Sequence, residues 1–365
     1  MPRSPLGAPR IGCLPSGALD AITDVAGVSV GHCTLSDGAV QTGATVLLPA
    51  PGNLFLHKLP AGLAVLNGFG KSAGLMQLRE LGQLESPIAL VSTFAVGTAS
   101  TALIRDAIAA NPELGRGLPT LNPLVLECND GWLNDAQAFA LQESHVRQAL
   151  QAAREAGPGA HFAQGSVGAG RGMSCHGLKG GIGSASRRVG WQGQAYTVGA
   201  LVLANQGRPE ALTLAGHRIG PVLQARQAAG AEPAGPERGS ILMLLATDAP
   251  LDARQLQRLA RRAGAGLART GSDYGHGSGD IALAFSTAYR LPQQADAPMP
   301  CVALLHESAL DLIFQAAAEA TEQAIVHALW TAQAVTGRDG RHRHALTGLA
   351  PELLTLGPEC LKPQP

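Results

Sequence analysis

Gly239 and Ser240 are the two residues whose types and position best fit a chemical step. They lie between residues 225–238, which carry Ala, Gly, Gln, Pro and Glu without apolar periodicity, and the short apolar run 241–246. The first segment is typical of an exposed loop and the second of a buried strand. If the chain were cut between Gly239 and Ser240, Ser240 would carry a hydroxyl nucleophile and an α-amine base on one residue. The structural alternative is a loop-to-strand turn that the Ser240 hydroxyl caps.

Ser72 is a second candidate nucleophile, because residues 70–74 match G-x-S-x-G between an apolar run and a helical pattern. A nucleophile elbow has this pattern. The same stretch resembles the end of a phosphate loop, but Val65 stands where such a loop needs its first glycine. The Gly-rich run 165–172 lacks the spacing of a dinucleotide-binding loop, since Met173 stands at its last glycine position. We therefore expect no nucleotide site at either stretch.

Composition and charge exclude several classes of protein. Charged residues make up 15% of the 365 residues and the net charge is zero, so nothing favours nucleic acid or an anionic membrane as a partner. Six scattered cysteines without CxxC pairs are typical of reduced core cysteines in a cytosolic protein. Neither the histidines nor the acidic residues have the spacing of a metal site. The start of the chain lacks the apolar segment of a signal peptide, and no run could span a membrane. We therefore expect a cytoplasmic enzyme.

Apolar runs and amphipathic patterns alternate along the whole chain, without an internal repeat. Apolar runs predict strands at residues 21–34, 43–49, 88–94, 124–127, 195–204, 241–246 and 279–288. Amphipathic patterns predict helices at residues 98–110, 135–156, 252–262 and 308–335. Capping boxes are expected at the start of the last two helices, on Asp252 with Gln255 and on Ser308 with Asp311. Such interleaving predicts a layered α/β fold around one continuous core.

Ordered blocks of the sequence resemble the DmpA-type L-aminopeptidase/D-esterase family, which includes the β-peptidyl aminopeptidases. The central block is the Gly239-Ser240 junction with the strand that follows it. The other blocks are residues 21–25, 127–135, 168–170, 180–183, 204–205, 269–272, 278–281 and 336–340. The resemblance covers essentially residues 17–346, and the fixed order of its blocks makes it specific.

This resemblance implies that one domain, residues 1–365, cuts itself into a large chain 1–239 and a small chain 240–365. It implies an α/β fold with four αββα layers, similar to the N-terminal nucleophile hydrolases but connected differently. It also implies removal of N-terminal residues from peptides, amides or esters with a free amino terminus, without a metal or other cofactor. Family members assemble as homo-oligomers, typically tetramers of the processed heterodimer.

The chemistry implied at Ser240 has two stages. In the precursor the Ser240 hydroxyl would attack the Gly239 carbonyl and move the acyl group to oxygen, and water would then cleave the ester. In the mature enzyme the same hydroxyl would attack a substrate carbonyl and form an acyl-enzyme. The freed α-amine has an ordinary pKa of roughly 7.7–8.0, which suits a general base near neutrality.

The resemblance gives roles to five further residues. Ser278 and Asp280 match a Ser-x-acid pair that relays protons near the nucleophile, with Asp280 at a position where Glu also occurs in the family. Asn205 matches a side-chain amide that donates to the oxyanion, and Glu127 matches the carboxylate that holds the substrate's amino group. Asn129 stands where some relatives carry Tyr, so its part in substrate binding or catalysis is left open.

Three other functions remain open at the level of sequence. One is a self-cleaving acyltransferase of the ornithine-acetyltransferase type, which would use Thr where this chain has Ser240. Another is an α/β-hydrolase esterase that uses Ser72. The last is an uncleaved, inactive homologue with a binding role.

Overall fold

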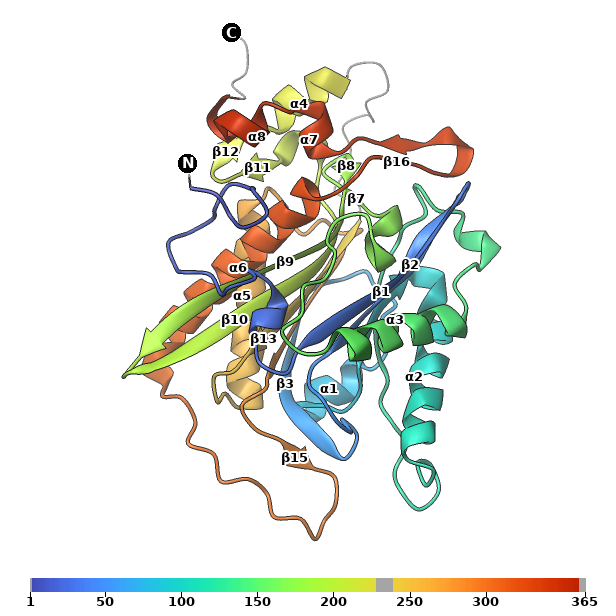
Figure 1. The fold of residues 1–365 in the computed structure, drawn as a ribbon, viewed down its shortest axis with the longest axis vertical. Helices are drawn as coiled ribbons and strands as arrows, with labels where there is room; N and C mark the ends of the chain where they lie inside the picture. Colours follow the sequence, from blue (N-terminus) through green and yellow to red (C-terminus); the bar gives the residue numbers. More distant parts are fainter. Residues whose placement is uncertain (1, 228–238, 361–365) are drawn as a thin grey trace.

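Two β-sheets lie face to face in the computed structural model, which describes residues 2–227 and 239–360 (Figure 1). The smaller sheet has the order β1-β2-β5-β6, with bounds β1 (Ser29–Asp37), β2 (Val40–Leu48), β5 (Ile88–Ser92) and β6 (Leu124–Cys128). The larger sheet has the order β15-β3-β14-β13-β10-β9, and β4 (Gln83–Leu84) pairs with β3. Its other bounds are β15 (Leu291–Pro292), β3 (His57–Gly68), β14 (Gly279–Ser286), β13 (Ser240–Thr247), β10 (Gln194–Asn205) and β9 (Gly181–Trp191).

Two helices cover the outer face of each sheet. Helices α2 (Val96–Ala110) and α3 (Glu143–Ala156) lie on the smaller sheet, and α5 (Ala253–Arg269) and α6 (Leu310–Trp330) lie on the larger one (Figure 1). The predicted αββα sandwich is therefore confirmed. The remaining helices are short: α1 (Leu75–Leu81), α4 (Gly220–Gln227), α7 (Leu346–Leu349) and α8 (Leu353–Leu356). Short strand pairs join β7 (Ser174–Cys175) to β8 (Leu178–Lys179), β11 (Thr213–Leu214) to β12 (His217–Arg218), and β16 (Val335–Thr336) to β17 (His342–Arg343).

Strand β13 lies at the centre of the molecule and is buried on both faces. Leu242 and Leu244 pack into the core between the two sheets. Ile241 and Met243 pack on the opposite face, in the core that α5 and α6 cover. A strand with helices on one face and a sheet on the other has no solvated side, which explains its unbroken apolar run.

The helices differ from the predictions at their starts. The capping box on Asp252 is confirmed, because its side chain accepts a hydrogen bond from the Gln255 amide at 2.7 Å. The box predicted on Ser308 and Asp311 is wrong: α6 begins at Leu310, without a side-chain hydrogen bond at its N-cap. The helix predicted at 135–156 is too long, since α3 begins at Glu143. Phe139 has a left-handed φ of 46°, which a continuous α-helix cannot contain.

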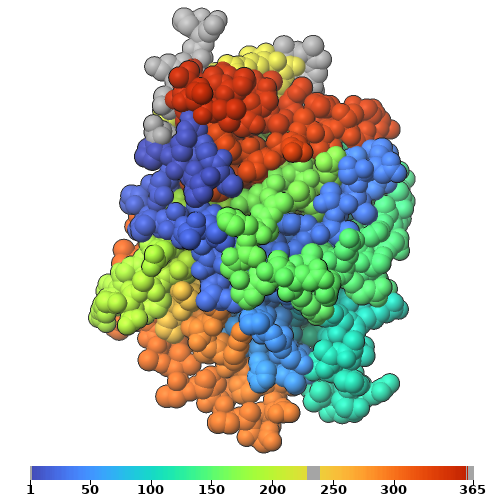
Figure 2. Space-filling view, viewed as in Figure 1, coloured from blue at the N-terminus to red at the C-terminus, as the bar shows by residue number. Residues whose placement is uncertain are grey.

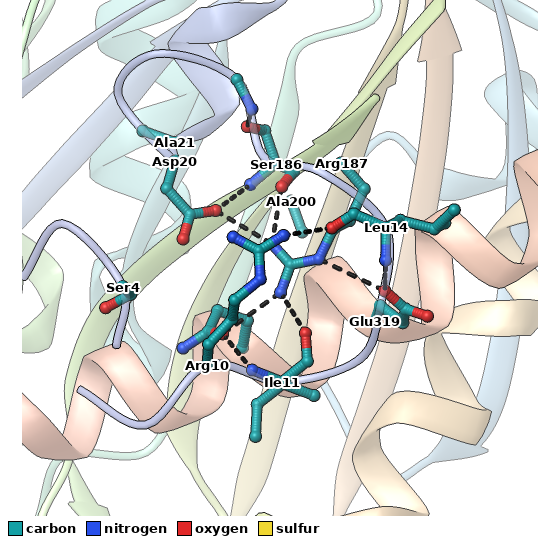
Figure 3. A network of polar contacts seen from close by, with 12 residues as sticks. Ser4, Arg10, Ile11, Leu14, Asp20, Ala21, Ser186, Arg187, Ala200 and Glu319 are labelled. Atoms are coloured by element: carbon teal, nitrogen blue, oxygen red, sulfur yellow. Dashed lines mark hydrogen bonds and ion pairs between the residues drawn. The ribbon is translucent and has the colours of Figure 1, made fainter. Parts of the chain in front are cut away.

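The N-terminal segment is fastened to β9 and α6 through the buried guanidinium of Arg187. Arg187 pairs with Asp20 at 3.0 Å and with Glu319 of α6 at 3.5 Å. Figure 3 shows the three side chains together. Its Nη2 also donates to the Ile11 carbonyl at 2.7 Å. Residues at the start of the chain lie against the C-terminal segment (Figure 2), where Arg3 donates to the Leu353 carbonyl. The described N-terminal and C-terminal segments thus contact each other.

Within residues 2–227 and 239–360, no helix combines the length and apolarity needed to cross a bilayer.

Candidate active site

Ser240 is the first residue of β13 and lies between two neighbouring strands. On one side it pairs with Asn205, the last residue of β10, in an antiparallel ladder. On the other side β13 runs parallel to β14, and the Gly279 amide donates a hydrogen bond to Ser240 Oγ at 3.1 Å. Only 6% of the Ser240 surface is exposed. The hydroxyl is therefore fixed by backbone register at the end of a rigid sheet.

Gly239 precedes the strand in a conformation that requires glycine. Its φ is 114°, a region that residues with a side chain rarely adopt. A Cβ at this position would stand 2.0 Å from the Asn205 carbonyl oxygen. The peptide between Gly239 and Ser240 is thus pressed against the backbone of Asn205 at the end of β10.

Ser278 and Asp280 flank the glycine whose amide contacts Ser240. The Ser278 hydroxyl donates to Asp280 Oδ1 at 2.6 Å, and both side chains are fully buried. Asp280 pairs with Ile241 in the β13–β14 ladder, one residue beyond the nucleophile candidate. The structure therefore places the predicted Ser-x-Asp pair next to the backbone of Ser240.

The Asn205 side chain is held in one orientation. Its Oδ1 accepts the Ser174 amide proton at 2.8 Å, so the oxygen of the amide is turned toward β7. Its Nδ2 donates to the Asn129 carbonyl at 3.0 Å. A side-chain amide nitrogen has two N–H groups. The contact with the Asn129 carbonyl uses one N–H of Asn205 Nδ2, and the other is left over. Asn205 can therefore donate a second hydrogen bond beside Ser240.

Glu127 lies near the end of β6, in the opposite sheet, and is 3% exposed. Its Oε1 accepts the Lys71 amide proton at 2.7 Å, and its Oε2 accepts the Thr93 hydroxyl proton. A Cβ built on Gly70 would stand 3.6 Å from Glu127 Oε1 and 3.9 Å from the Cα of Gly279. Gly70 therefore lies between the Glu127 carboxylate and Gly279, the residue of β14 whose amide contacts Ser240 Oγ.

Asn129 and Ser72 support the loops around Glu127. The Asn129 carbonyl accepts from Asn205, while its side-chain Oδ1 accepts the Gly131 amide proton at 2.9 Å in a local turn. Ser72 Oγ accepts the Glu127 amide proton at 3.3 Å. Both residues therefore lie beside the predicted site, and the contact of the Ser72 hydroxyl is with backbone.

Asp130 is a buried acid next to the site whose role the sequence did not indicate. It accepts the Thr42 hydroxyl proton at 2.6 Å and an Asn134 amide proton at 3.1 Å. Burial raises the pKa of the Asp130 carboxyl to about 6, against the lowering effect of these hydrogen bonds. The charge of Glu127 raises this pKa further. The signal available in the sequence was its place within residues 127–135, a block that matches the family.

Cys128 lies between these acidic groups. Burial raises the pKa of its thiol well above the ordinary value, and the charges of Glu127, Asp280 and Asp130 raise it further. Its Sγ is 3.8 Å from the Leu203 carbonyl. A thiol in such surroundings stays protonated and behaves as a small apolar core side chain.

The fold is an αββα sandwich similar to that of the N-terminal nucleophile hydrolases, and comparison with known proteins identifies the family. The sequence profile of peptidase family S58 matches residues 20–343. The chain belongs to this family and is a peptidase.

Three relatives carry names that describe their activity. The β-peptidyl aminopeptidase BapA of Sphingosinicella xenopeptidilytica is 39% identical over 350 residues, which cover 91% of this chain and 85% of that protein. The solved β-aminopeptidase of a Burkholderia species superposes with a TM-score of 0.87 at 40% identity, covering 99% of both chains. The L-aminopeptidase D-Ala-esterase/amidase of Ochrobactrum anthropi superposes with a TM-score of 0.85 at 33% identity, covering 96% of both. That last structure is described as a prototype for the serine aminopeptidases and a new variant among the Ntn hydrolase fold.

Proposed function

We propose that this peptidase is a self-cleaving aminopeptidase whose nucleophile, Ser240, becomes the first residue of a small chain 240–365. The observation that carries the proposal is the register at the start of β13. It brings the Ser240 hydroxyl to the Gly279 amide, one residue from Asp280, and pairs Ser240 with Asn205. The glycine-only conformation of Gly239 on the scissile peptide supports the same reading.

In the precursor, Ser240 Oγ attacks the carbonyl carbon of Gly239 as the buried Ser278–Asp280 pair takes the hydroxyl proton, which the pair later passes to the Ser240 nitrogen. The negative charge that develops on the Gly239 oxygen is stabilised by the second N–H of Asn205 Nδ2. The C–N bond then breaks, the Ser240 nitrogen takes up a proton, and the acyl group remains on oxygen as an ester. Water hydrolyses this ester, which leaves a carboxylate on Gly239 and an amine on Ser240.

In the mature enzyme the freed α-amine of Ser240 takes the hydroxyl proton as the hydroxyl attacks a substrate carbonyl. The amine then gives the proton to the leaving group, and an acyl-enzyme remains until water releases it. Asn205 again donates to the oxyanion, a contribution of about 2.7–4 kcal/mol for one such donor. The buried Ser278–Asp280 pair stabilises the ammonium form of the amine between the two transfers.

The substrate class follows from Glu127 and from the named relatives. A buried carboxylate next to the nucleophile suits a substrate that brings its own ammonium group. One of the relatives is named a β-peptidyl aminopeptidase, one a β-aminopeptidase, and one an L-aminopeptidase D-Ala-esterase/amidase. We therefore propose peptides, amides and esters with a free amino terminus as substrates, with short β-peptides as the first to test. From the family resemblance we propose a homo-oligomer, a tetramer of processed heterodimers, and from the scattered cysteines a cytoplasmic location.

The mass of the purified protein tests the proposal. We expect two chains of residues 1–239 and 240–365, and an N-terminal sequence of Ser-Ile-Leu-Met for the smaller one. Ser240→Ala should yield one uncut chain without activity. Ser72→Ala should still be cut and active, since the contact of its hydroxyl is with the Glu127 backbone. A single intact chain that hydrolyses substrate would contradict the mechanism, and loss of activity only in Ser72→Ala would favour the esterase alternative.

A further inference from the structure

Gln206 carries a buried side-chain amide that the proposed mechanism leaves unused. It follows Asn205 directly and is 1% exposed. In the part of the chain that the structure describes, neither its Oε1 nor its Nε2 has a hydrogen-bond partner. The neighbouring amide of Asn205, by contrast, is bonded on its oxygen and on its nitrogen.

An amide with both ends unpaired in a protein interior is unfavourable. Leaving one buried polar group without a partner costs about 1–3 kcal/mol, and such groups are rare in folded proteins. The backbone of Gln206 is nevertheless fixed, because its carbonyl accepts the His176 amide proton at 2.8 Å. The imidazole of His176 in turn lies against Gly207, where a Cβ would overlap it. The backbone contacts of Gln206 thus fix its position, and hydrogen bonds of its side chain do not contribute.

The position of this amide is next to the scissile peptide. The β10–β13 ladder ends with Asn205 opposite Ser240, and Gln206 is one residue beyond that last pair. A Cβ built on Gly239 would stand 3.5 Å from the Cα of Gln206. The backbone of Gln206 therefore lies beside Gly239, and the Gly239–Ser240 bond is within the length of the Gln206 side chain.

Cleavage of that bond creates a group that the uncut chain lacks. The peptide nitrogen of Ser240 has one hydrogen and no basic lone pair, whereas the amine that replaces it has two hydrogens when neutral and three when charged. Hydrolysis adds one water, whose oxygen goes to the Gly239 carboxylate. A new hydrogen-bond donor thus appears on Ser240, beside an amide oxygen that has no partner. An amide can present either end by a half-turn about its last bond.

We propose that Gln206 is a positioning residue for the catalytic amine: its Oε1 accepts an N–H of the Ser240 α-amine and turns the lone pair toward Ser240 Oγ. This inference rests on the proposed self-cleavage. It gives the unpaired amide a partner that exists only in the mature enzyme. A general base works only when its lone pair faces the proton that it removes, so a fixed amine transfers protons faster than a rotating one.

The charged and titratable neighbours of the amine come from three other elements. Asp280 on β14 pairs with the residue after Ser240, and the charges of Glu127, Asp130 and Asp280 all act on the buried Cys128 thiol at the end of β6. His176 contacts Gln206 itself through its backbone. Gln206 is neutral, so its effect in this group is to orient the amine without adding charge.

Gln206→Leu tests this role in two backgrounds. In the uncut Ser240→Ala protein it should leave the melting temperature unchanged or raise it, because it removes polar atoms that have no partner. Gln255→Leu is the matched control: that buried amide bonds to Asp252 and to Leu305, so its loss should lower the melting temperature. In the cleavable protein, Gln206→Leu should still mature, and kcat should fall roughly 10-fold, as expected for one hydrogen bond, at little changed KM.

Gln206→Glu adds a readout that a structural role would not move. A carboxylate next to the amine favours the ammonium form and raises its pKa. Because the base must be neutral to act, the rising limb of kcat/KM against pH should shift to higher pH in this variant. Gln255→Glu should leave the limb in place.

Three other results would contradict the proposed role of Gln206 or the proposed function. A Gln206→Leu protein that stays uncut, or that melts lower as Gln255→Leu does, would show that the amide supports the precursor itself. Wild-type turnover in Gln206→Leu together with an unmoved limb in Gln206→Glu would show that water alone satisfies the amide. An uncut wild-type protein would refute the proposed function, and that result is read from the mass before any kinetics.

Discussion

The hydroxyl of Ser240 accepts a hydrogen bond from the amide of Gly279, across the parallel pair β13–β14 of the larger sheet. Ser278 and Asp280 lie on either side of that glycine. A Cβ on Gly279 would stand 3.1 Å from the hydroxyl oxygen, so the two strands meet at this point without room for a side chain. The distance between the nucleophile candidate and its acid pair is therefore set by sheet register and not by a flexible loop.

Gly239→Ala should block self-cleavage. Its methyl group would stand 2.0 Å from the Asn205 carbonyl oxygen, and its φ of 114° disfavours any side chain. The scissile peptide must then leave its place beside Asn205, and we expect the protein to remain largely uncut by mass spectrometry. Gly193→Ala is the control: its φ is also positive, at 80°, but a Cβ there has nothing within 4 Å. Equal cleavage in both variants and the wild type would contradict the steric reading.

Asp280→Asn should slow both maturation and turnover, because one buried Ser278–Asp280 pair is proposed to handle protons in both reactions. General acid–base assistance is typically worth about 10²–10⁴-fold in rate, and a loss within that range is expected in each step. The rate of cleavage after a refolding start and kcat of the mature protein measure the two effects. Asp248→Asn, at the far end of β13, should leave both rates normal. A fully matured Asp280→Asn protein with normal turnover would show that Asp280 only caps the start of β14 and takes no part in proton transfer.

Glu127→Gln should reduce kcat/KM for substrates with a free amine. A hydrogen bond to a charged group contributes about 1.5–3 kcal/mol, or roughly 10- to 150-fold. N-acetylated substrates should be poor for the wild type and equally poor for the variant. Self-cleavage should be largely retained, since the precursor offers no free amine at Ser240. If the wild type hydrolyses blocked and free peptides equally well, Glu127 holds only its loop through Lys71 and Thr93.

Asp130 should make the fold less stable as the pH rises from about 4 to 6. Burial raises the pKa of its carboxyl from 3.8 to about 6, so the folded state binds the proton more tightly than the unfolded chain does. The stability that the proton provides is complete below the unfolded value and is lost as the pH rises through the folded one. A shift of this size corresponds to about 3 kcal/mol.

Urea unfolding of the uncut Ser240→Ala protein measures this effect. The free energy of unfolding of the Asp130→Asn variant should gain on that of the parent as the pH rises from 4 to 6.5. Parallel curves for the two proteins would mean that the Asp130 carboxyl titrates as an exposed acid does.

Local signals in the sequence were sufficient for the main strand and for the unusual backbone before it. The apolar run after Ser240 predicted β13, and the glycine before it predicted an unusual backbone. Strand β9 was not predicted, because its glycines resemble a loop. Its Gly183 is needed for close packing instead: a Cβ there would stand 1.9 Å from the Ala324 carbonyl of α6. That requirement arises only when the helix is in place.

The partners of the site residues could not be predicted from the sequence, because they depend on strand order. Asn205 is oriented by Ser174, 31 residues away, and Ser240 is bonded by Gly279, 39 residues away. That the side-chain amide of Gln206 has no hydrogen-bond partner among the described residues can be recognised only when all of its neighbours are known. Resemblance to a family transferred roles to single positions, and it could not indicate which neighbours hold those positions in geometry.

The order of the larger sheet has a consequence for the lifetime of the mature enzyme. Strands β14 and β13 would belong to the small chain after cleavage, and they lie between β3 and β10 of the large chain. The two fragments are then interleaved within one hydrogen-bonded sheet and joined by the buried pair of Arg187 and Glu319. They could separate only by global unfolding, and refolding would become a second-order reaction that depends on fragment concentration. Persistence of the mature protein would then be governed by its unfolding rate and not by an equilibrium between folded and unfolded states.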